Sequence, residues 1–291
     1  AGEVSPTELL EAALTRHQEV DGAINAIPTL CVERAQICAE EITAMPVPDD
    51  GRPWLAGLPI VVKDLVDVKG VRTTKGSLIH KDRVAEVSDI LVDRLEERGA
   101  VVLGKSNTPE FGAGAHTFNE VFGMTRNPWD LTKSAGGSSG GSAAALASGQ
   151  VWLATGSDFG GSLRNPASFC SVVGFRASPG RVPRGPRTHS FGTMSIEGPM
   201  ARTVADAAMM FDCQTGDHPL DPLSLPAPEV PFSATLESAP PPVRIGYSPD
   251  LGGITPVAGA VRDILAAAIS SLQRSGFDVV EAAPDFNDAN E

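Results

Sequence analysis

The feature that most constrains this chain is a pair of glycine- and serine-rich blocks, residues 132–142 and 156–161. The first block leads into a helix of small residues expected over 143–148, and the second follows an apolar strand expected over 152–155. Glycines in a turn after a strand let consecutive backbone N–H groups point the same way, which makes a site for negative charge. Ser162 stands at the end of the second block. A plain glycine turn would be the default interpretation if that block stood alone.

The rest of the chain alternates between apolar strands and helices with recognisable caps. Ser5, Pro6 and Glu8 form a capping box that predicts a first helix, and Ser88 and Thr203 are predicted to cap two others, ending at 98 and 211. Residues 214–242 are proline-rich and predict a surface excursion. The alternation predicts an α/β fold with a mixed central sheet covered by helices on both faces. The other expected elements are helices over 32–45 and 257–274 and strands over 58–62, 101–103, 243–247 and 278–281.

Length, charge and cysteines exclude several classes of protein. A chain of 291 residues can form one large domain or two smaller ones. The net charge of -13 argues against a nucleic-acid partner, and no run of 18 apolar residues predicts a membrane span. Without a CxxC pair or paired histidine spacing, the sequence predicts no metal site and a reduced, cytoplasmic setting. The four cysteines are Cys31, Cys38, Cys170 and Cys213.

One glycine-rich segment matches the phosphate-loop pattern. Residues 99–106 read Gly-Ala-Val-Val-Leu-Gly-Lys-Ser, with Lys105 in the lysine position. A phosphate loop needs a strand before its first glycine and a helix after its lysine. Here a helix comes before Gly99, the variable positions resemble a strand, and Asn107-Thr108-Pro109 predicts a turn. A P-loop nucleotide hydrolase is therefore carried only as a disfavoured alternative from a different class.

A second segment matches the nucleophile elbow of serine hydrolases that use a histidine. Residues 137–141 fit G-x-S-x-G with Ser139 at its centre, but residues 130–133 before it do not predict a strand. His189 and His218 could complete such a triad, but both lie in sequence without a structural pattern. Surface histidines are the preferred interpretation.

Taken together, the two blocks closely resemble the amidase signature family. The matching residues are 136–145, 156–167, 169–176, 180–183 and 198–203, with a lysine strand at 57–64 and a further segment at 104–111. The resemblance runs from about residue 5 to about residue 285. It implies one amidase signature domain over 1–291, truncated at the C-terminus and compatible with a missing N-terminal segment, since family members are considerably longer.

The resemblance also implies the site. Lys63 is the base, Ser138 is a bridging serine that follows a cis peptide bond, and Ser162 is the nucleophile. The amides of Phe159, Gly160 and Gly161, with that of Ser162, are the oxyanion donors. Gly137, Ser139 and Asp158 support these groups. No cofactor or metal is implied, and the pocket walls come partly from residues 111–116 and 191–194 and from C-terminal segments.

The chemistry of these residue types is consistent with these roles. A serine hydroxyl attacks a carbonyl only when a base accepts its proton. A lysine can be that base when burial makes its neutral form accessible, and Lys63 follows the apolar run Ile60-Val61-Val62. Ser138 would pass the proton between Ser162 and Lys63.

The implied function is a serine hydrolase that cleaves C–N bonds through an acyl-enzyme on Ser162. Amides, aryl amides, esters and carbamates (urethanes) are all compatible with that chemistry, acting as small-molecule substrates of a protein that is compatible with a homodimer. The alternative within the family is the A-type chain of a glutamyl-tRNA amidotransferase. Those chains usually carry Gln at the position of Asn165 and Ser-Ser-Leu-Asp-Gln where this chain has Thr193-Met194-Ser195-Ile196-Glu197. The sequence therefore favours a free-standing amidase over an amidotransferase component or a catalytically dead relative.

Overall fold

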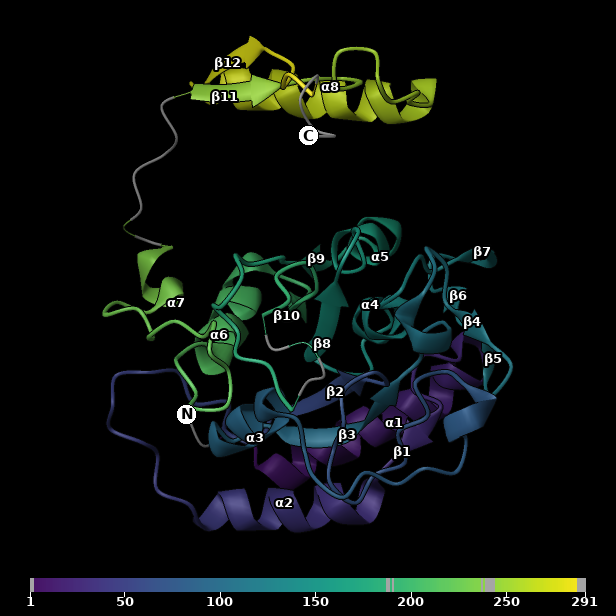
Figure 1. The fold of residues 1–291 in the computed structure, drawn as a ribbon, viewed down its shortest axis with the longest axis vertical. Helices are drawn as coiled ribbons and strands as arrows, with labels where there is room; N and C mark the ends of the chain where they lie inside the picture. Colours follow the sequence, from purple (N-terminus) through teal and green to yellow (C-terminus); the bar gives the residue numbers. More distant parts are fainter. Residues whose placement is uncertain (1–2, 187–188, 190, 237, 239–243, 287–291) are drawn as a thin grey trace. The chain divides into compact units, whose positions relative to one another are not determined.

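The computed structural model describes residues 3–186, 189, 191–236, 238 and 244–286. The chain divides into two compact units, residues 1–236 and 237–291, and each is described by itself. Figure 1 shows the order of the elements by colour along the chain.

The first unit is built on a mixed sheet of six strands in the order β1-β3-β2-β8-β10-β9 (Figure 1). The inner strands β3, β2 and β8 are parallel, whereas β1, β10 and β9 pair antiparallel. This is the mixed sheet that the sequence predicts. The strands are β1 (Thr29–Leu30), β2 (Pro59–Lys63), β3 (Val101–Ser106), β8 (Leu153–Asp158), β9 (Val173–Gly174) and β10 (Ile196–Ala201).

Alternating side chains of the central strands belong to two separate apolar cores. Val61 packs in one core, while Ile60 and Val62 on either side of it pack in the other. Because successive strand residues face opposite sides, both faces of the sheet are buried. The first core is covered by α1 (Pro6–Ile24), α2 (Val32–Ala44), α4 (Gly140–Ala147) and α5 (Arg164–Cys170), and the second by α3 (Ile90–Glu97) and α6 (Val204–Gln214).

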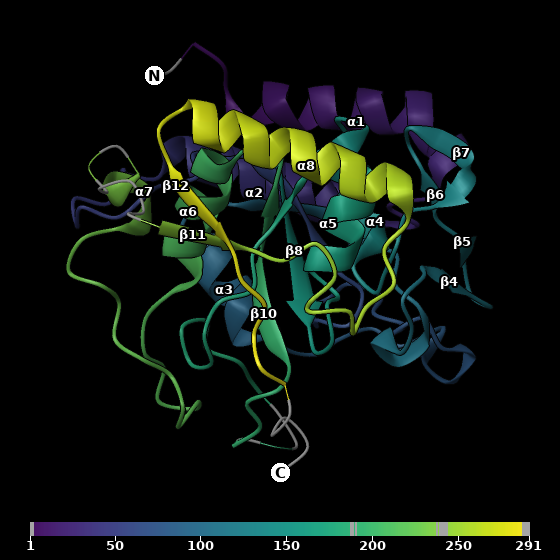
Figure 2. The ribbon, with the colours of Figure 1, turned by 90° about the horizontal axis from the view of Figure 1, so that it is seen from above.

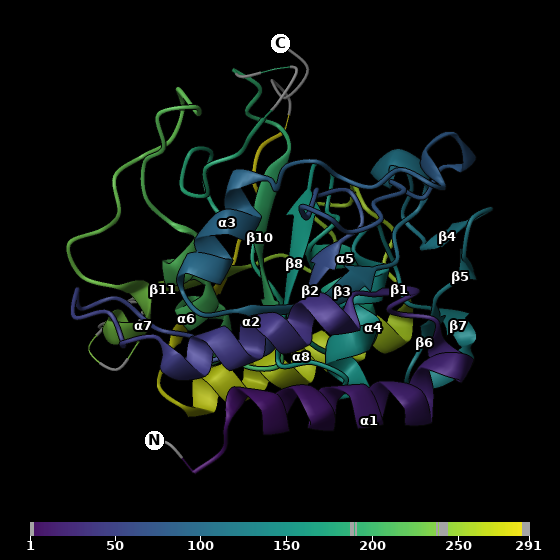
Figure 3. The same cartoon turned by 90° about the horizontal axis from the view of Figure 1, so that it is seen from below.

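Figures 2 and 3 show these helices and strands from above and from below. Helices α1 and α2 lie side by side along the sheet (Figure 3), and α4 contacts both α5 and β8. Among the described helices, none is both long and apolar enough to cross a membrane.

The predicted helix starts are confirmed at two of three positions. The capping box of Ser5 and Glu8 is complete, and the Thr203 hydroxyl accepts a hydrogen bond from the Asp206 amide. The prediction for Ser88 was wrong, because the N-cap of α3 is Asp89. The Ser88 hydroxyl instead accepts a hydrogen bond from the Lys69 amide, at 3.0 Å.

Residues 130–133 form a strand, contrary to the prediction. Strand β7 (Asp130–Ser134) pairs with β6 (Arg126–Asn127) in an exposed two-stranded ribbon, so no buried face leaves an apolar pattern in the sequence. A second ribbon joins β4 (Phe118–Asn119) and β5 (Gly123–Met124). Short 3-10 turns cover Leu78–His80 and Glu110–Gly112.

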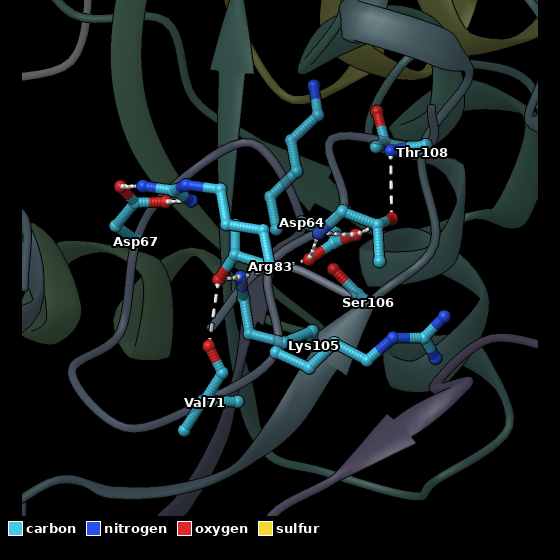
Figure 4. Close-up of polar contacts among 12 residues, drawn as sticks. Asp64, Asp67, Val71, Arg83, Lys105, Ser106 and Thr108 are labelled. Carbon is cyan, nitrogen blue, oxygen red and sulfur yellow. Dashed lines mark hydrogen bonds and ion pairs between the residues drawn. The ribbon is translucent and has the colours of Figure 1, made fainter. Parts of the chain in front are cut away.

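The segment that matches the phosphate-loop pattern is a buried strand. It runs from Gly99 into β3, and Lys105 is fully buried. Lys105 Nζ lies 3.0 Å from Asp64 Oδ1 (Figure 4) and 2.8 Å from Thr73 Oγ1. A lysine held in a buried ion pair cannot reach a phosphate. The segment that matches the phosphate-loop pattern therefore has a structural role.

The last part of the chain contains the predicted β-α-β unit. Strands β11 (Arg244–Tyr247) and β12 (Asp278–Glu281) pair in parallel and are joined by α8 (Gly259–Arg274). Val243, expected to begin the first of these strands, lies outside the described residues. Within its described residues, the proline-rich excursion contains the short helix α7 (Phe232–Thr235).

Candidate active site

Lys63 ends β2 and is fully buried among three serine hydroxyls. Its Nζ lies 2.7 Å from Ser138 Oγ, 2.9 Å from Ser139 Oγ and 3.0 Å from Ser157 Oγ. The Lys63 backbone is fixed by the parallel neighbours β3 and β8, and its amide donates to Thr155 Oγ1. The ammonium group therefore has hydroxyls around it, and its hydrogen bonds within the described residues include no carboxylate.

This environment favours the neutral form of the lysine. Burial lowers the pKa of Lys63 to about 7, against an ordinary value of 10.5. The carboxylates of Glu197 and Asp158 oppose that shift by raising the pKa of the amine, but burial outweighs them. Near pH 7 the amine therefore has a large neutral fraction that can accept a proton.

Ser138 and Ser139 lie in the loop that enters α4. Both are buried, and the Gly137–Ser138 peptide bond is cis, as the family resemblance implies. Position 137 requires glycine, because a Cβ there would lie 2.8 Å from the backbone nitrogen of His116. The two serine blocks are joined directly, since the Ser139 amide donates to the Ser162 carbonyl at 3.2 Å.

Asp158 organises the glycine turn that follows β8. Its carboxylate accepts from the amides of Gly161 at 2.8 Å and Leu163 at 3.2 Å, and it pairs with Arg164 and Arg176. Burial opposes ionisation of Asp158, but the Arg164 side chain and these two amides outweigh it and hold the pKa of Asp158 well below its usual range. The carboxylate therefore stays charged and fixes the turn.

The turn leaves backbone donors available beside Ser162. The Gly161 amide, expected among the oxyanion donors, is used by Asp158 in this structure. The amides of Phe159, Gly160 and Ser162 donate to no acceptor within the described part of the chain. The turn thus keeps three of the four predicted donors, the amides of Phe159, Gly160 and Ser162.

Ser138 and Ser162 line one cavity of about 500 Å³. Ser162 is half-buried there, and its hydroxyl makes no hydrogen bond to any other described residue. No charged side chain lines the cavity in the part of the chain that the structure describes. Its walls include residues 111–115, Phe159, Asn165 and Ser195, whereas residues 191–194, expected as a wall, are not among its lining.

The structure brings together the lysine, both serines and the glycine turn, and leaves the histidines elsewhere. His218 Nδ1 accepts from the Leu220 amide in a surface turn, and neither His218 nor His189 lines this cavity. The sequence analysis missed Ser157, whose hydroxyl contacts Lys63. Its place next to Asp158 at the end of a strand was the available signal.

Comparison with known proteins identifies relatives along nearly the whole chain. The protein family described as Amidase matches residues 8–289. A curated relative from Anaeromyxobacter dehalogenans (strain 2CP-C), the A-type chain of its glutamyl-tRNA(Gln) amidotransferase, is 38% identical over 282 residues. That match covers 96% of this chain and 57% of the relative.

Two solved structures of hydrolases are also similar. A 6-aminohexanoate cyclic dimer hydrolase complexed with substrate superposes with a TM-score of 0.88 at 34% identity. A bacterial aryl acylamidase belonging to the amidase signature enzymes does so with a TM-score of 0.88 at 32% identity. Each comparison covers 97% of this chain and 58% of the other, so the chain spans less than two thirds of the length of these relatives.

Proposed function

Because this chain belongs to the amidase signature family, whose enzymes hydrolyse C–N bonds, we propose that it forms an acyl-enzyme on Ser162. The observation that carries the proposal is the 2.7 Å contact between buried Lys63 and Ser138, in a cavity that Ser138 shares with Ser162. A neutral amine beside a serine relay is what a serine nucleophile needs in place of histidine.

The proposed cycle uses only groups on this chain. Ser162 Oγ attacks the carbonyl carbon while its proton passes to Ser138 Oγ, and the Ser138 proton passes to Lys63 Nζ. The negative oxygen of the tetrahedral intermediate is held by the amides of Phe159, Gly160 and Ser162. The proton then returns through Ser138 to the leaving nitrogen, the C–N bond breaks, and water hydrolyses the ester on Ser162 by the same relay.

The substrate class proposed for this site is a neutral amide. A cavity of about 500 Å³ without charged side chains among its described lining has no group to pair with a charged substrate. Phe111 and Phe159 offer apolar surface at its edge, which favours an aryl or alkyl amide. Esters and carbamates fit the same acylation step, so carbamate hydrolysis belongs to the proposal.

The A-type chain of an amidotransferase is the second candidate. The 38% identity to the Anaeromyxobacter relative supports it, and that identity is higher than to either hydrolase structure. Measured by identity, the comparisons favour this candidate over the free-standing amidase. The residues at Asn165 and 193–197, which differ from the pattern usual in those amidotransferase chains, and the TM-scores of the hydrolases support the first.

An assay with two substrate sets separates the candidates. A free-standing amidase should release 4-nitroaniline from neutral acyl anilides without any partner, and Ser162→Ala should abolish that release. An amidotransferase component should hydrolyse glutamine and remain inactive on anilides. Turnover of anilides or of glutamine retained in the Ser162→Ala variant would rule out the proposed nucleophile under the corresponding candidate.

The remaining parts of the proposal concern setting and organisation. We assign residues 1–291 to one amidase signature domain, and the family match over 8–289 supports this because it spans both compact units. A cytoplasmic location and a homodimer remain predictions.

A further inference from the structure

A second, polar cavity lies next to the candidate active site. It has a volume of about 210 Å³ and shares Leu65, Ser157 and Ser195 with the first cavity. Unlike the first, it is lined by charged side chains. These are Asp67, Lys75, Asp89, Arg184 and Glu197.

Glu197 is the unusual member of this group. It is buried, with 8% of its surface exposed, and its Oε1 lies 3.3 Å from Arg184 Nη2. Its other oxygen, Oε2, is buried and has no hydrogen-bond partner within the described residues. A buried carboxylate oxygen without a partner is costly, so its retention calls for an explanation.

The strand register places Glu197 beside Ser157, one of the three serines that contact Lys63. Glu197 on β10 is directly opposite Ser157 on β8 in the antiparallel pair. Side chains of directly opposed residues lie on the same face with Cβ atoms about 5 Å apart. Ser157 Oγ in turn lies 3.0 Å from Lys63 Nζ, so a hydroxyl separates the carboxylate from the amine.

The other charged groups in this region already have counter-charges or hydrogen bonds. Asp158, which also acts on Lys63, pairs with Arg164 and Arg176. Asp64 pairs with Lys105, as Figure 4 shows.

The carboxylates on the far side of the cavity are held in a similar way. Asp67 pairs with Arg83, and Asp89 accepts a hydrogen bond from the Asp67 amide. Lys75 and Arg184 are the cations that line the cavity. Of the two carboxylates that act on Lys63, Asp158 pairs with two arginines and Glu197 with one, so Glu197 is the less compensated of the two.

We propose that Glu197 is a positioning residue for the reaction. Its Oε2, which has no hydrogen-bond partner among the described residues, supplies across Ser157 the negative charge that stabilises protonated Lys63. This inference rests on the proposed function, in which Lys63 receives a proton during each acylation. Among the described side chains, only hydroxyls hydrogen-bond to the ammonium that then forms, so a nearby negative charge makes the proton transfer more favourable. Glu197 contacts no reacting atom and acts only through Lys63.

The first test measures Lys63 itself. The protein is labelled with ¹³C at lysine Cε, the Lys63 signal is assigned with a Lys63→Met variant, and its chemical shift is followed against pH. Removing a neighbouring negative charge disfavours the ammonium, so in Glu197→Gln the titration midpoint should move to lower pH by about one unit. An unchanged midpoint would overturn the proposal.

The second test measures turnover. The acid limb of the kcat/KM profile for a neutral anilide should shift to lower pH in parallel, with a roughly tenfold lower plateau because the amine is a weaker base. A shift in the Lys63 signal without a shift in the rate profile would confirm the electrostatic link between Glu197 and Lys63. It would remove Lys63 as the base, and with it the role of Glu197 in the reaction. Failure of the electrostatic link to Glu197 and failure of Lys63 as the base can therefore be told apart.

Two further variants control for structure. Asp89→Asn removes another carboxylate from the same cavity while keeping an acceptor for the Asp67 amide, and it should leave the Lys63 midpoint in place. Glu197→Asp keeps the charge but moves it away from Ser157, so its midpoint should lie between those of the original protein and Glu197→Gln. If Glu197→Gln does not fold, a midpoint in Glu197→Asp identical to the original would count against the proposal.

Discussion

Lys63 illustrates how the surroundings of one residue decide its chemistry. It is among the largest fully buried side chains, together with Lys105, yet the two lysines have different partners. Lys105 lies against the Asp64 carboxylate, whereas Lys63 lies against three hydroxyls. Burial lowers the pKa of both amines. Of the two, only Lys63 contacts a serine, Ser138, that lines the candidate active-site cavity.

The activity should therefore depend on pH through Lys63. Because the pKa of Lys63 is lowered to about 7, its neutral fraction falls below that pH and saturates above it. We expect kcat/KM for a neutral amide to rise with pH through a midpoint near this value and then to level off. Rates measured from pH 5 to 9 check this, and a flat profile or one that falls with rising pH would exclude a neutral lysine base.

Gly137 provides a second test at the residue scale. A Cβ at this position would lie 2.8 Å from the His116 nitrogen and 2.9 Å from the His116 carbonyl carbon, both backbone atoms. We expect Gly137→Ala to lower kcat at least a hundredfold by displacing Ser138, with a loss of about 1–3 kcal/mol in unfolding free energy. Urea unfolding and turnover measure the two effects.

The matched control is Gly22→Ala in α1. A Cβ there meets nothing within 4 Å, and alanine is favoured over glycine in a helix. This variant should keep full activity. Equal losses in the two variants would contradict the steric account of Gly137.

Several site residues could be predicted from the sequence, and others could not. The lysine, the two serines and the glycine turn belong to contiguous motifs, so their spacing along the chain identifies them. Ser157 and Glu197 meet only through the register of β8 against β10. Register depends on packing between distant segments, which one sequence does not display.

The strand ends illustrate the same limit at the scale of elements. The predicted strands at 58–62, 101–103 and 152–155 all exist, but β3 continues to Ser106 and β8 to Asp158. Their last residues are polar or glycine and resemble a loop in composition. They are buried because the carboxyl ends of parallel strands converge at the site, where polar side chains have partners.

The turn after β8 depends on a single carboxylate. Asp158 binds two amides of the turn and two arginines, so Asp158→Asn would keep an amide acceptor but leave both guanidinium groups without their counter-charge. We expect a loss of about 2–4 kcal/mol in unfolding free energy, with lower kcat as the Ser162 turn loosens. Urea unfolding and turnover check both.

Asp130→Asn is a suitable comparison for that variant. Asp130 also accepts a hydrogen bond from a backbone amide, that of Thr132, but it is exposed in β7. Its replacement should leave the unfolding free energy nearly unchanged. A similar loss of unfolding free energy in both variants would show that burial of Asp158 contributes nothing to stability.

At the scale of the whole molecule, the sequence predicted the fold class correctly. The mixed sheet with helices on both faces and the β-α-β unit follow from the alternation of periodic segments. Composition did not predict the ribbons β4-β5 and β6-β7, which are too short and too exposed to leave a pattern. The chain matches 57% of the curated relative's length, so substrate preference and partners stay proposals for the protein as a whole.

The most direct test of the central claim is to locate the acyl group. The protein is mixed with an activated ester of a neutral acid, quenched in acid within the first turnovers, digested and analysed by mass spectrometry. We predict one acyl group on the peptide that contains Ser162, and none in Ser162→Ala. An acyl group on Ser138, Ser139 or any other residue, with Ser162 unmodified, would contradict the account.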